Sequence, residues 1–396
     1  EWRHLSDFSS ANDINATLYA EFCSIPVDRY PCTPGTEWVT LQHDFQRTGH
    51  SGNALGDAYC DLTNIWTYNS ADVSNWSAPM IKDGLVVAAF NDEYVVFNLD
   101  DGTQVTSLSS GTNSWCVPTV ATVDIGGTPT ELLFVTGGDA ADVTAYRWPS
   151  LTFEWNYASG ALGATTRWGN FMVLNDGTTD VLYFAEDNGR INALNAADGT
   201  AYAGWTGPLV LTGFGPTTTR TGASNGTDRL FYGVSIVGFL GDIIALDAFT
   251  RTIDWQLSSA GGLQGAGLYG IDPSVSDEGF TGGLTFEAAG DGQPDRIFAN
   301  SAISGAANAG VFYSINANDG SVLVATQAHG SRFAHPILDA NQVIIPSFST
   351  FFTPPSGGDM IAYNKTTGST IWAASSAGER PYLRYYTDGP MTCEGE

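Results

Sequence analysis

Apolar and polar residues alternate along most of this chain with a period of two, which is typical of strands that bury one face. Helical periodicity is almost absent. Six segments combine an apolar strand, a turn rich in Asp, Asn or Gly, and a second strand that often ends in Trp, and each is predicted to be a β-hairpin. They are residues 95–108, 143–157, 191–205, 243–257, 311–326 and 360–374. Their regular spacing of about 50 residues predicts a propeller or another repeat array rather than a sandwich.

A second repeated element reads as the first strand of each unit. Its copies are residues 75–84, 114–123, 167–177, 220–228, 268–279, 332–341 and 383–390. The segment 64–69 reads as an outer strand that precedes any first strand, whereas 383–390 is a first strand with nothing after it. These two orphans predict a last blade closed by both chain ends, which leaves no exposed sheet edge at that junction. We therefore predict an all-β, seven-bladed β-propeller of four-stranded antiparallel blades, with six or eight blades as alternatives.

The hairpins 191–205, 243–257 and 360–374 resemble the repeat of quinoprotein-alcohol-dehydrogenase-like β-propellers, which is roughly Y-A-L-D-x-x-T-G-x-x-x-W. The segment 38–51 resembles the lead-in found before the first blade of many members. The resemblance covers residues 37 to 390, so it implies one propeller domain over 37–396 and an N-terminal extension over 1–36. Because the family includes dehydrogenases, assembly scaffolds and non-redox enzymes, the resemblance implies the fold rather than the activity.

Charge excludes two classes of partner. The chain has 42 acidic and 15 basic residues, a formal net charge of -27. Nucleic acid needs Lys and Arg to replace its counterions, and anionic membrane surfaces repel such a chain. No apolar run approaches the roughly 18–20 residues of a membrane span. We expect neither nucleic acid nor a membrane span, and note that all basic residues except Lys82 and Lys365 are Arg.

Cysteines and glycosylation signals favour a secreted protein. The five Cys residues allow two disulfides and one further thiol. We expect the disulfides among Cys23, Cys32, Cys60 and Cys393, with a Cys23–Cys32 bridge holding the extension. N-x-S/T acceptor sites occur at Asn15, Asn75, Asn225 and Asn364. The chain also begins at Glu1 without an initiator Met, as a processed secreted form would.

Candidate binding residues emerge when the starts of the seven first strands are aligned. In a propeller the innermost strand lines the central channel, and its first residues lie near the mouth, where ligands usually bind. The predicted substrate-binding residues are Trp76, Trp115, Arg167, Trp168, Arg220, Tyr269, Phe333 and Tyr385, and the predicted catalytic residues are Arg332, His335 and Arg384. We call these eleven residues the predicted rim. The competing interpretation is that its aromatic residues pack the narrow inner ends of the blades and its Arg residues pair with local carbonyls or acids.

The composition of the predicted rim indicates a ligand class. Trp and Tyr stack on planar molecules, Arg donates paired hydrogen bonds to oxygens that gain charge, and His335 could act as an acid or base near neutral pH. We expect a hydrophobic, oxygenated, conjugated small molecule. Members of the family that use a quinone carry adjacent cysteines and a calcium ion, whereas this chain has no adjacent cysteines and no D-x-D-x-D-G array. No cofactor and no metal are therefore predicted.

These features favour a secreted, cofactor-independent enzyme. The chain resembles fungal hetero-Diels-Alderases in kind, and that resemblance implies a natural-product cyclase that orients a diene and an alkene while polarising a carbonyl. Two other function classes stay open: a non-catalytic extracellular binding or scaffold propeller, and a quinone-dependent oxidoreductase.

Overall fold

The structure is a computed structural model in which every regular element of the described residues is a β-strand. It describes residues 17–19, 39, 44–45, 66–69, 79–90, 93–109, 116–136, 143–158, 171–186, 189–210, 218–236, 240–258, 283–288, 290, 293–301, 310–328, 336–339, 341–347 and 359–375. The all-β prediction is confirmed. Within these residues, no helix is long and apolar enough to cross a membrane.

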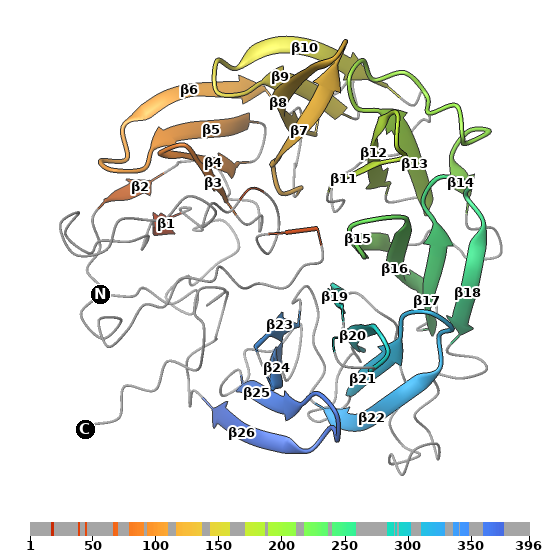
Figure 1. The fold of residues 1–396 in the computed structure, drawn as a ribbon. Helices are drawn as coiled ribbons and strands as arrows, with labels where there is room; N and C mark the ends of the chain where they lie inside the picture. Colours follow the sequence, from red (N-terminus) through yellow and green to blue (C-terminus); the bar gives the residue numbers. More distant parts are fainter. Residues whose placement is uncertain are drawn as a thin grey trace.

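Six four-stranded antiparallel sheets surround a common centre (Figure 1). Blade 1 contains β3 (Met80–Lys82), β4 (Leu85–Ala89), β5 (Glu93–Asn98) and β6 (Gln104–Ser109); blade 2 contains β7 (Thr119–Ile125), β8 (Thr128–Val135), β9 (Val143–Arg147) and β10 (Thr152–Tyr157); blade 3 contains β11 (Met172–Asn175), β12 (Asp180–Ala185), β13 (Arg190–Asn195) and β14 (Leu209–Val210). Blade 4 contains β15 (Thr218–Ser224), β16 (Arg229–Ile236), β17 (Leu240–Asp247) and β18 (Ile253–Ser258); blade 5 contains β19 (Thr285–Glu287), β20 (Arg296–Asn300), β21 (Gly310–Asn316) and β22 (Val322–Ala328); blade 6 contains β23 (Ile337–Leu338), β24 (Gln342–Ser347), β25 (Asp359–Asn364) and β26 (Thr370–Ser375).

Each blade is hydrogen-bonded in chain order, with its first strand innermost and its fourth strand outermost (Figure 1). The two middle strands are almost wholly buried because both of their faces pack against neighbouring blades, as in β4 and β5. The outer strands are half exposed, and in five blades each gains one extra residue opposite the third strand. Such bulges turn the edge strand away from pairing with another chain.

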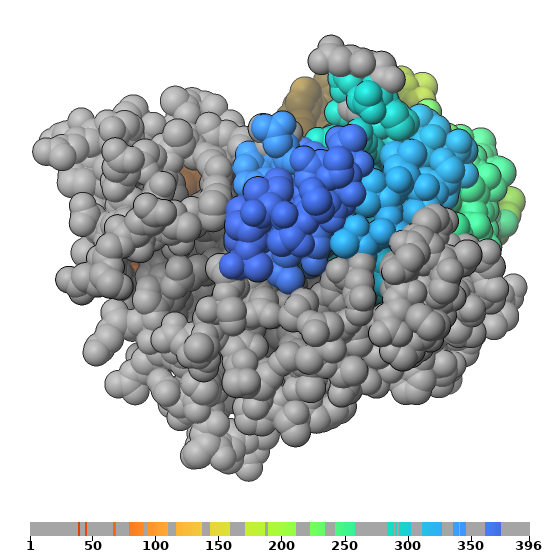
Figure 2. All heavy atoms as spheres, turned by 90° about the horizontal axis from the view of Figure 1, so that it is seen from below, coloured from red at the N-terminus to blue at the C-terminus, as the bar shows by residue number. Residues whose placement is uncertain are grey.

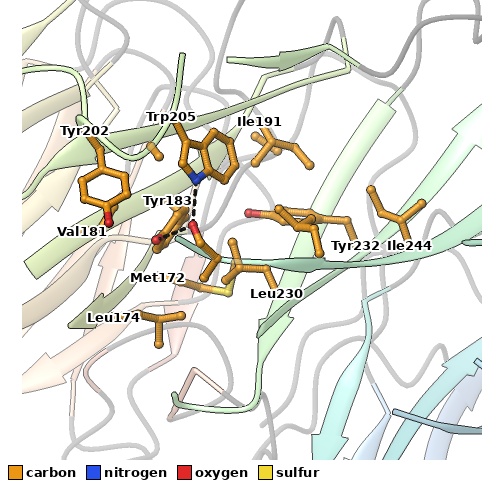
Figure 3. Close-up of a cluster of buried hydrophobic side chains, with 14 residues drawn as sticks. Met172, Leu174, Val181, Tyr183, Ile191, Tyr202, Trp205, Leu230, Tyr232 and Ile244 are labelled. Atoms are coloured by element: carbon orange, nitrogen blue, oxygen red, sulfur yellow. Dashed lines mark hydrogen bonds between the residues drawn. The ribbon is translucent and has the colours of Figure 1, made fainter. Parts of the chain in front are cut away.

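The core is divided into layers between adjacent blades. Side chains of β12 alternate, so Leu182 and Phe184 pack toward blade 2, while Val181, Tyr183 and Ala185 pack toward blade 4. Figure 3 shows the layer between blades 3 and 4, where the Tyr183 hydroxyl and the Trp205 indole both donate to the Ala248 carbonyl, at 2.8 and 2.7 Å. Period-two patterning therefore supplies an apolar face to both neighbours of each blade.

Tryptophans of the outer strands join one blade to the next. Trp155 donates its indole N–H to the Ala196 carbonyl at 3.0 Å, and Trp255 donates to the Ala317 carbonyl at 3.0 Å. Each indole also covers a glycine of the receiving turn: a Cβ at Gly199 would lie 2.5 Å from Trp155. Gly199 has φ +72°, a conformation that favours glycine. The predicted Trp and Asx-Gly signals of the hairpins are therefore two halves of one contact between blades.

Blades 5 and 6 are joined differently, because β22 has Val324 at the position where β10 and β18 have Trp155 and Trp255. Arg296 donates to the Lys365 carbonyl at 3.1 Å, and the Lys365 ammonium pairs with Glu287 of β19. The two blades adjoin in Figure 2, where blue atoms of residues 359–375 lie beside the lighter blue atoms of residues 310–328. An ionic contact replaces the indole contact at this junction.

A two-stranded sheet pairs β1 (Thr17–Tyr19) with β2 (Thr67–Asn69). Trp66, next to β2, donates to the Leu99 carbonyl of blade 1 at 2.8 Å and covers Gly102. This is the contact that Trp155 and Trp255 make, so β2 holds the position of an outer strand of a blade that precedes blade 1. The contact agrees with the interpretation of residues 64–69 as an orphan outer strand, while the count of seven blades, the closure by residues 383–390 and the division at residue 37 stay predictions.

Two sequence assignments were wrong. The first strand of blade 5 is β19, not residues 268–279, because Thr285–Glu287 pair with β20. Tyr269 was therefore aligned with the wrong strand. Residues 201–205 were expected to form a full outer strand, but they make only a single bridge, Leu194 with Ala201, before a turn. Trp205 docks from that turn, and the outer strand of blade 3 is the two-residue β14.

Candidate functional site

The two ends of the propeller differ in chemistry. One end, which we call the turn end, carries the turns that follow first and third strands, such as 83–84, 176–179 and 225–228. Asp and Asn side chains hold these turns by accepting nearby backbone N–H groups, as Asp176 does from Thr178 and Thr179. Tyr202 also donates to Asp176 at 2.7 Å, and this hydrogen bond lowers the pKa of Asp176 to about 2. The Asp and Asn residues at these positions are therefore explained by turn formation.

Basic side chains at the turn end form ion pairs and hydrogen bonds within the protein. Lys82 pairs with Glu131 of the next blade at 3.2 Å. Arg229 pairs with Asp254 at 2.8 Å and also donates to the Ala317 carbonyl. Arg251 donates to the Gly207 carbonyl at 3.1 Å. These three basic side chains are therefore committed to contacts within the protein.

The opposite end, which we call the loop end, is where the first strands begin and the second strands finish. Arg220 is the one residue of the predicted rim within the described chain, and it lies in β15, the innermost strand of blade 4. Thr219 pairs with Val234 and Gly222 with Tyr232, so β15 gains one residue at Arg220 and Thr221. A bulge in an inner strand re-aims side chains and is common beside active sites.

The rest of the predicted rim lies outside the described residues: Trp76, Trp115, Arg167, Trp168, Tyr269, Arg332, Phe333, His335, Arg384 and Tyr385. So do Cys23, Cys32, Cys60 and Cys393, and the acceptor sites Asn15 and Asn75. The other two acceptor sites fall at the turn end. The side-chain oxygens of Asn225 and Asn364 accept backbone N–H groups of their own turns.

Buried polar residues at the loop end form two separate groups, and each residue is at most 4% exposed. Tyr94, in the layer between blades 1 and 2, contacts Cys116 and Thr136, while Glu186 and Asn192 lie on the face of blade 3 that packs toward blade 2. The Tyr94 hydroxyl donates to the Cys116 carbonyl at 3.2 Å and lies 2.7 Å from Thr136 Oγ1. Asn192 Nδ2 donates to Glu186 Oε1 at 2.8 Å. Polar groups that are buried to this degree are normally hydrogen-bonded. Those that lie in a functional region are candidates for a binding or catalytic role.

Aromatic rings pack in the same layer as Glu186 and Asn192. Phe171 lies between Phe134 and Phe184, with its ring centroid 6.2 Å from that of Phe134 and 6.1 Å from that of Phe184. Phe184 is directly opposite Asn192 on the neighbouring strand, so Asn192 and Glu186 continue the face of β12 and β13 that packs toward blade 2. Cys116 and Phe171 belong to the same layer. The loop end of this layer thus has a carboxylate and an amide beside aromatic rings that are tilted toward one another.

The sequence links this layer to the predicted rim. Trp115 directly precedes Cys116, and Arg167 and Trp168 precede Phe171 by four and three residues. Sequence reasoning missed Glu186, although a signal was present: it is the first of two acids that follow the apolar run 181–185. The sequence comparison considered only the starts of the first strands. In an antiparallel blade the second strand ends at the same end of the blade, so its last residues can also reach the site.

A second buried carboxylate lies one layer further along. Asp242 is 2% exposed and accepts a hydrogen bond from Gln256 Nε2 at 2.7 Å. It shares the face of β17 with Ile244, which packs in the layer between blades 3 and 4. Asp242 therefore resembles Glu186 in burial and in having an amide donor, but belongs to a different layer.

The described residues do not supply the metal centre that quinone-using propellers employ. No group of three or more His, Cys, Asp or Glu side chains among them could hold a metal ion. Cys116, the cysteine within the described chain, is buried and has no adjacent cysteine in the sequence. These residues do not fit a quinone–cation site, and no chemical step is assigned to such a group.

Comparison with known proteins supports the fold. Residues 240–395 match the family model described as outer membrane protein assembly factor BamB. A europium-containing methanol dehydrogenase is similar in structure, with a TM-score of 0.62 at 12% identity over 88% of this chain and 79% of that one. The quinohemoprotein alcohol dehydrogenase from Comamonas testosteroni gives a TM-score of 0.56 at 13% identity, over 87% and 68% of the two chains. No curated protein matches the sequence. At these identities the likeness concerns the fold alone.

Proposed function

Since the chain has the fold of the quinoprotein-alcohol-dehydrogenase-like β-propellers, we propose that it is a non-redox enzyme that binds a hydrophobic, oxygenated, conjugated small molecule at the loop end of its channel. The observation that carries this proposal is the bulge in β15, which places Arg220 at an irregular point of an innermost strand. The engagement of basic side chains in contacts at the turn end supports the same choice of end.

The proposed chemistry follows from the groups at this end. Arg donates paired hydrogen bonds to carbonyl or carboxylate oxygens, and aromatic side chains stack on conjugated rings. An enzyme of this composition would hold two unsaturated partners in contact and stabilise charge on an oxygen, which suits a cycloaddition such as a hetero-Diels-Alder reaction. All atoms of the two partners are retained in such a product, so no oxidant or reductant is required.

A binding experiment tests the proposed site. We would titrate the protein with coumarin-3-carboxylate, a planar conjugated anion, and follow quenching of tryptophan fluorescence. Arg220→Gln should weaken binding about ten-fold or more, because a hydrogen bond to a charged group is lost. Arg251→Gln is the matched control, since Arg251 belongs to the same blade but contacts carbonyls at the turn end; its affinity should stay within about two-fold of wild type.

Two outcomes would overturn the proposed site: no binding to the wild-type chain, or equal weakening by the two substitutions. The enzymatic part has its own assay. An o-quinone methide generated in solution with an electron-rich alkene should form its cycloadduct faster with wild-type protein than with Arg220→Gln. An adduct rate unaffected by the wild-type protein would count against the cyclase while leaving the binding site intact.

A scaffold function is the second candidate, and one surface feature favours it. Each blade has an exposed apolar side chain on its outermost strand: Val105, Phe153, Val210, Ile253, Leu323 and Ile371. The match to the BamB model over 240–395 points in the same direction. Sedimentation velocity of wild type and Phe153→Ser over a range of concentrations tests self-assembly. A scaffold of this kind predicts association that Phe153→Ser reduces and no coumarin binding.

We also propose that the protein is secreted. Both acceptor sites within the described chain, Asn225 and Asn364, occupy surface turns, where an attached glycan meets solvent. Expression through a eukaryotic secretory pathway followed by glycosidase treatment should lower the mass of the product. If the protein is exported normally but its mass is unchanged by the glycosidase, Asn225 and Asn364 do not support the proposal of secretion.

A further inference from the structure

We infer that the lead-in between Val39 and Phe45 is a strap that fastens blade 2 to blade 4 across the channel, and that this strap opens and closes as one unit while the blades stay folded. The inference goes beyond the proposed function, because it concerns the channel wall and not the ligand. It is argued from Val39, Phe45 and their partners in the described chain.

Two backbone hydrogen bonds attach the strap to different blades. The Val39 carbonyl accepts from the N–H of Val120 in β7 at 2.8 Å, and the Phe45 carbonyl accepts from the N–H of Ser224 in β15 at 2.9 Å. β7 and β15 are the innermost strands of blades 2 and 4 (Figure 1). Each of them lies at the end of its sheet, so these N–H groups belong to free edges, where the sheet itself offers no acceptor.

The Phe45 side chain covers the blade that the strap passes. It packs against the layer between blades 2 and 3 and also against the layer between blades 3 and 4. These two layers lie on opposite faces of blade 3. Because the Phe45 carbonyl is bonded at the inner edge of β15, its ring reaches both layers across the inner edge of blade 3. An apolar contact therefore holds the strap in addition to the hydrogen bonds.

The two attachment points also differ in their depth along the channel. Val120 is the second residue of β7, near the loop end, whereas Ser224 is the last residue of β15, at the turn end. The chain from Val39 to Phe45 can extend about 20 Å, which is about the length of a seven-residue strand such as β7. The strap is thus long enough to join both the two blades and the two ends of the channel.

The strap is less buried than a strand inside a blade. Middle strands such as β12 are hydrogen-bonded on both sides and almost wholly buried, whereas Val39, Asp44 and Phe45 are only partly buried. Segments with fewer buried contacts open at a lower free energy than the ladders beside them. The strap belongs to none of the six described blades, so its opening breaks no ladder. The N–H groups of Val120 and Ser224 then face water in the channel.

Hydrogen exchange of single backbone amides tests the strap. We would follow the full chain by NMR at several low urea concentrations. Val120 and Ser224 should exchange through one opening, so their protection factors should agree within about two-fold and fall with urea at the same slope. Both should be smaller than the protection factors of the β12 amides. Fast exchange at either amide in the wild-type chain, or a larger difference between the two, would overturn the inference.

Phe45→Ala separates a strap from two independent contacts. Loss of the partly buried ring should lower the protection of Ser224 by about ten-fold. If the strap opens as a unit, the protection of Val120 should fall by the same factor, although its acceptor is Val39 in another part of the strap. A fall at Ser224 alone, or no change at either amide, counts against the strap.

Phe153→Ala is the matched control, because it removes the same side chain from an exposed position on β10. The protection of both amides should equal that of the wild-type chain, and an equal fall in this variant would show a general loss of stability and refute the role of Phe45. If Phe45→Ala does not fold, Phe45→Leu keeps part of the apolar contact and should lower both protection factors by one smaller, shared factor. Unequal factors in that variant again overturn the inference.

Discussion

The indole contacts between blades allow a quantitative test of how the propeller is stabilised. Trp155→Phe and Trp255→Phe are the same substitution at equivalent positions of blades 2 and 4. The first removes the indole donor of the Ala196 carbonyl, which has no second side-chain donor among the described contacts. The second removes one of two donors, because the Ala317 carbonyl also accepts from Arg229 at 3.2 Å.

The two substitutions should differ in cost. A buried carbonyl left without its donor costs about 1–3 kcal/mol, and the smaller ring leaves a cavity in the layer at about 1 kcal/mol more. We therefore expect Trp155→Phe to lower the free energy of unfolding by about 2–4 kcal/mol. Trp255→Phe should cost about 1–2 kcal/mol, since Arg229 still satisfies the carbonyl and mainly the cavity contributes.

Urea unfolding followed by circular dichroism gives both values, because this signal does not depend on the substituted indole. The dependence of free energy on urea should keep the same slope in all variants, which would show that the extent of unfolding is unchanged. A double-mutant cycle tests whether the shared carbonyl is the cause. Trp255→Phe combined with Arg229→Met removes both donors of the Ala317 carbonyl, so it should cost about 1 kcal/mol more than the sum of the single changes. Equal losses for the two Trp variants, or an additive cycle, would refute the argument that carbonyl satisfaction decides the cost.

Three further outcomes are expected. Gly222→Ala should lower the free energy of unfolding by about 1–3 kcal/mol in a urea titration, because the new Cβ would lie 2.6 Å from a Tyr232 ring atom. Gly84→Ala, in open space at φ +73°, should cost about 1–2 kcal/mol from backbone strain alone. Tyr202→Phe should raise the pKa of Asp176 from about 2 toward its ordinary value, measured by NMR titration. The stability from that carboxylate is present above about pH 4 and lost as pH falls toward 2, so the variant should lose less on acidification than wild type does. Lys365→Met should cost about 1–2 kcal/mol in the same urea titration, because it removes the ammonium partner of Glu287, a carboxylate that is 24% exposed. A loss no larger than that for replacing an exposed Lys would contradict this.

Local patterns were sufficient for most of the hairpins. Residues 95–108, 143–157, 243–257, 311–326 and 360–374 form third and fourth strands as predicted, because alternation and turn residues act over a few positions. Residues 201–205 departed from the pattern because Trp205 reaches the Ala248 carbonyl from a turn, and tertiary packing overrode the local preference for a strand. The first strand of blade 5 was misplaced because β19 has only three residues, too few for a distinctive pattern.

Only part of the candidate site could be predicted from the sequence. Alignment of strand starts placed Arg220 on an innermost strand, as found, but it could not show the bulge, which depends on the register between β15 and β16. It also missed Glu186, because an acid after an apolar run looks the same in a surface turn as in a buried layer. The rest of the predicted rim stays a prediction.

The sequence by itself determined the repeat, the strand alternation and the Trp and Gly positions that join the blades, because each of these is a short-range property. Tertiary structure decided which polar residues are buried together. Tyr94 of blade 1 and Thr136 of blade 2 lie far apart in the sequence, and their hydroxyls come within 2.7 Å only because the sheets pack face to face around a common centre. That packing likewise determines that Arg229 satisfies a carbonyl 88 residues away, while Glu186 lies at the end where a ligand is proposed to bind.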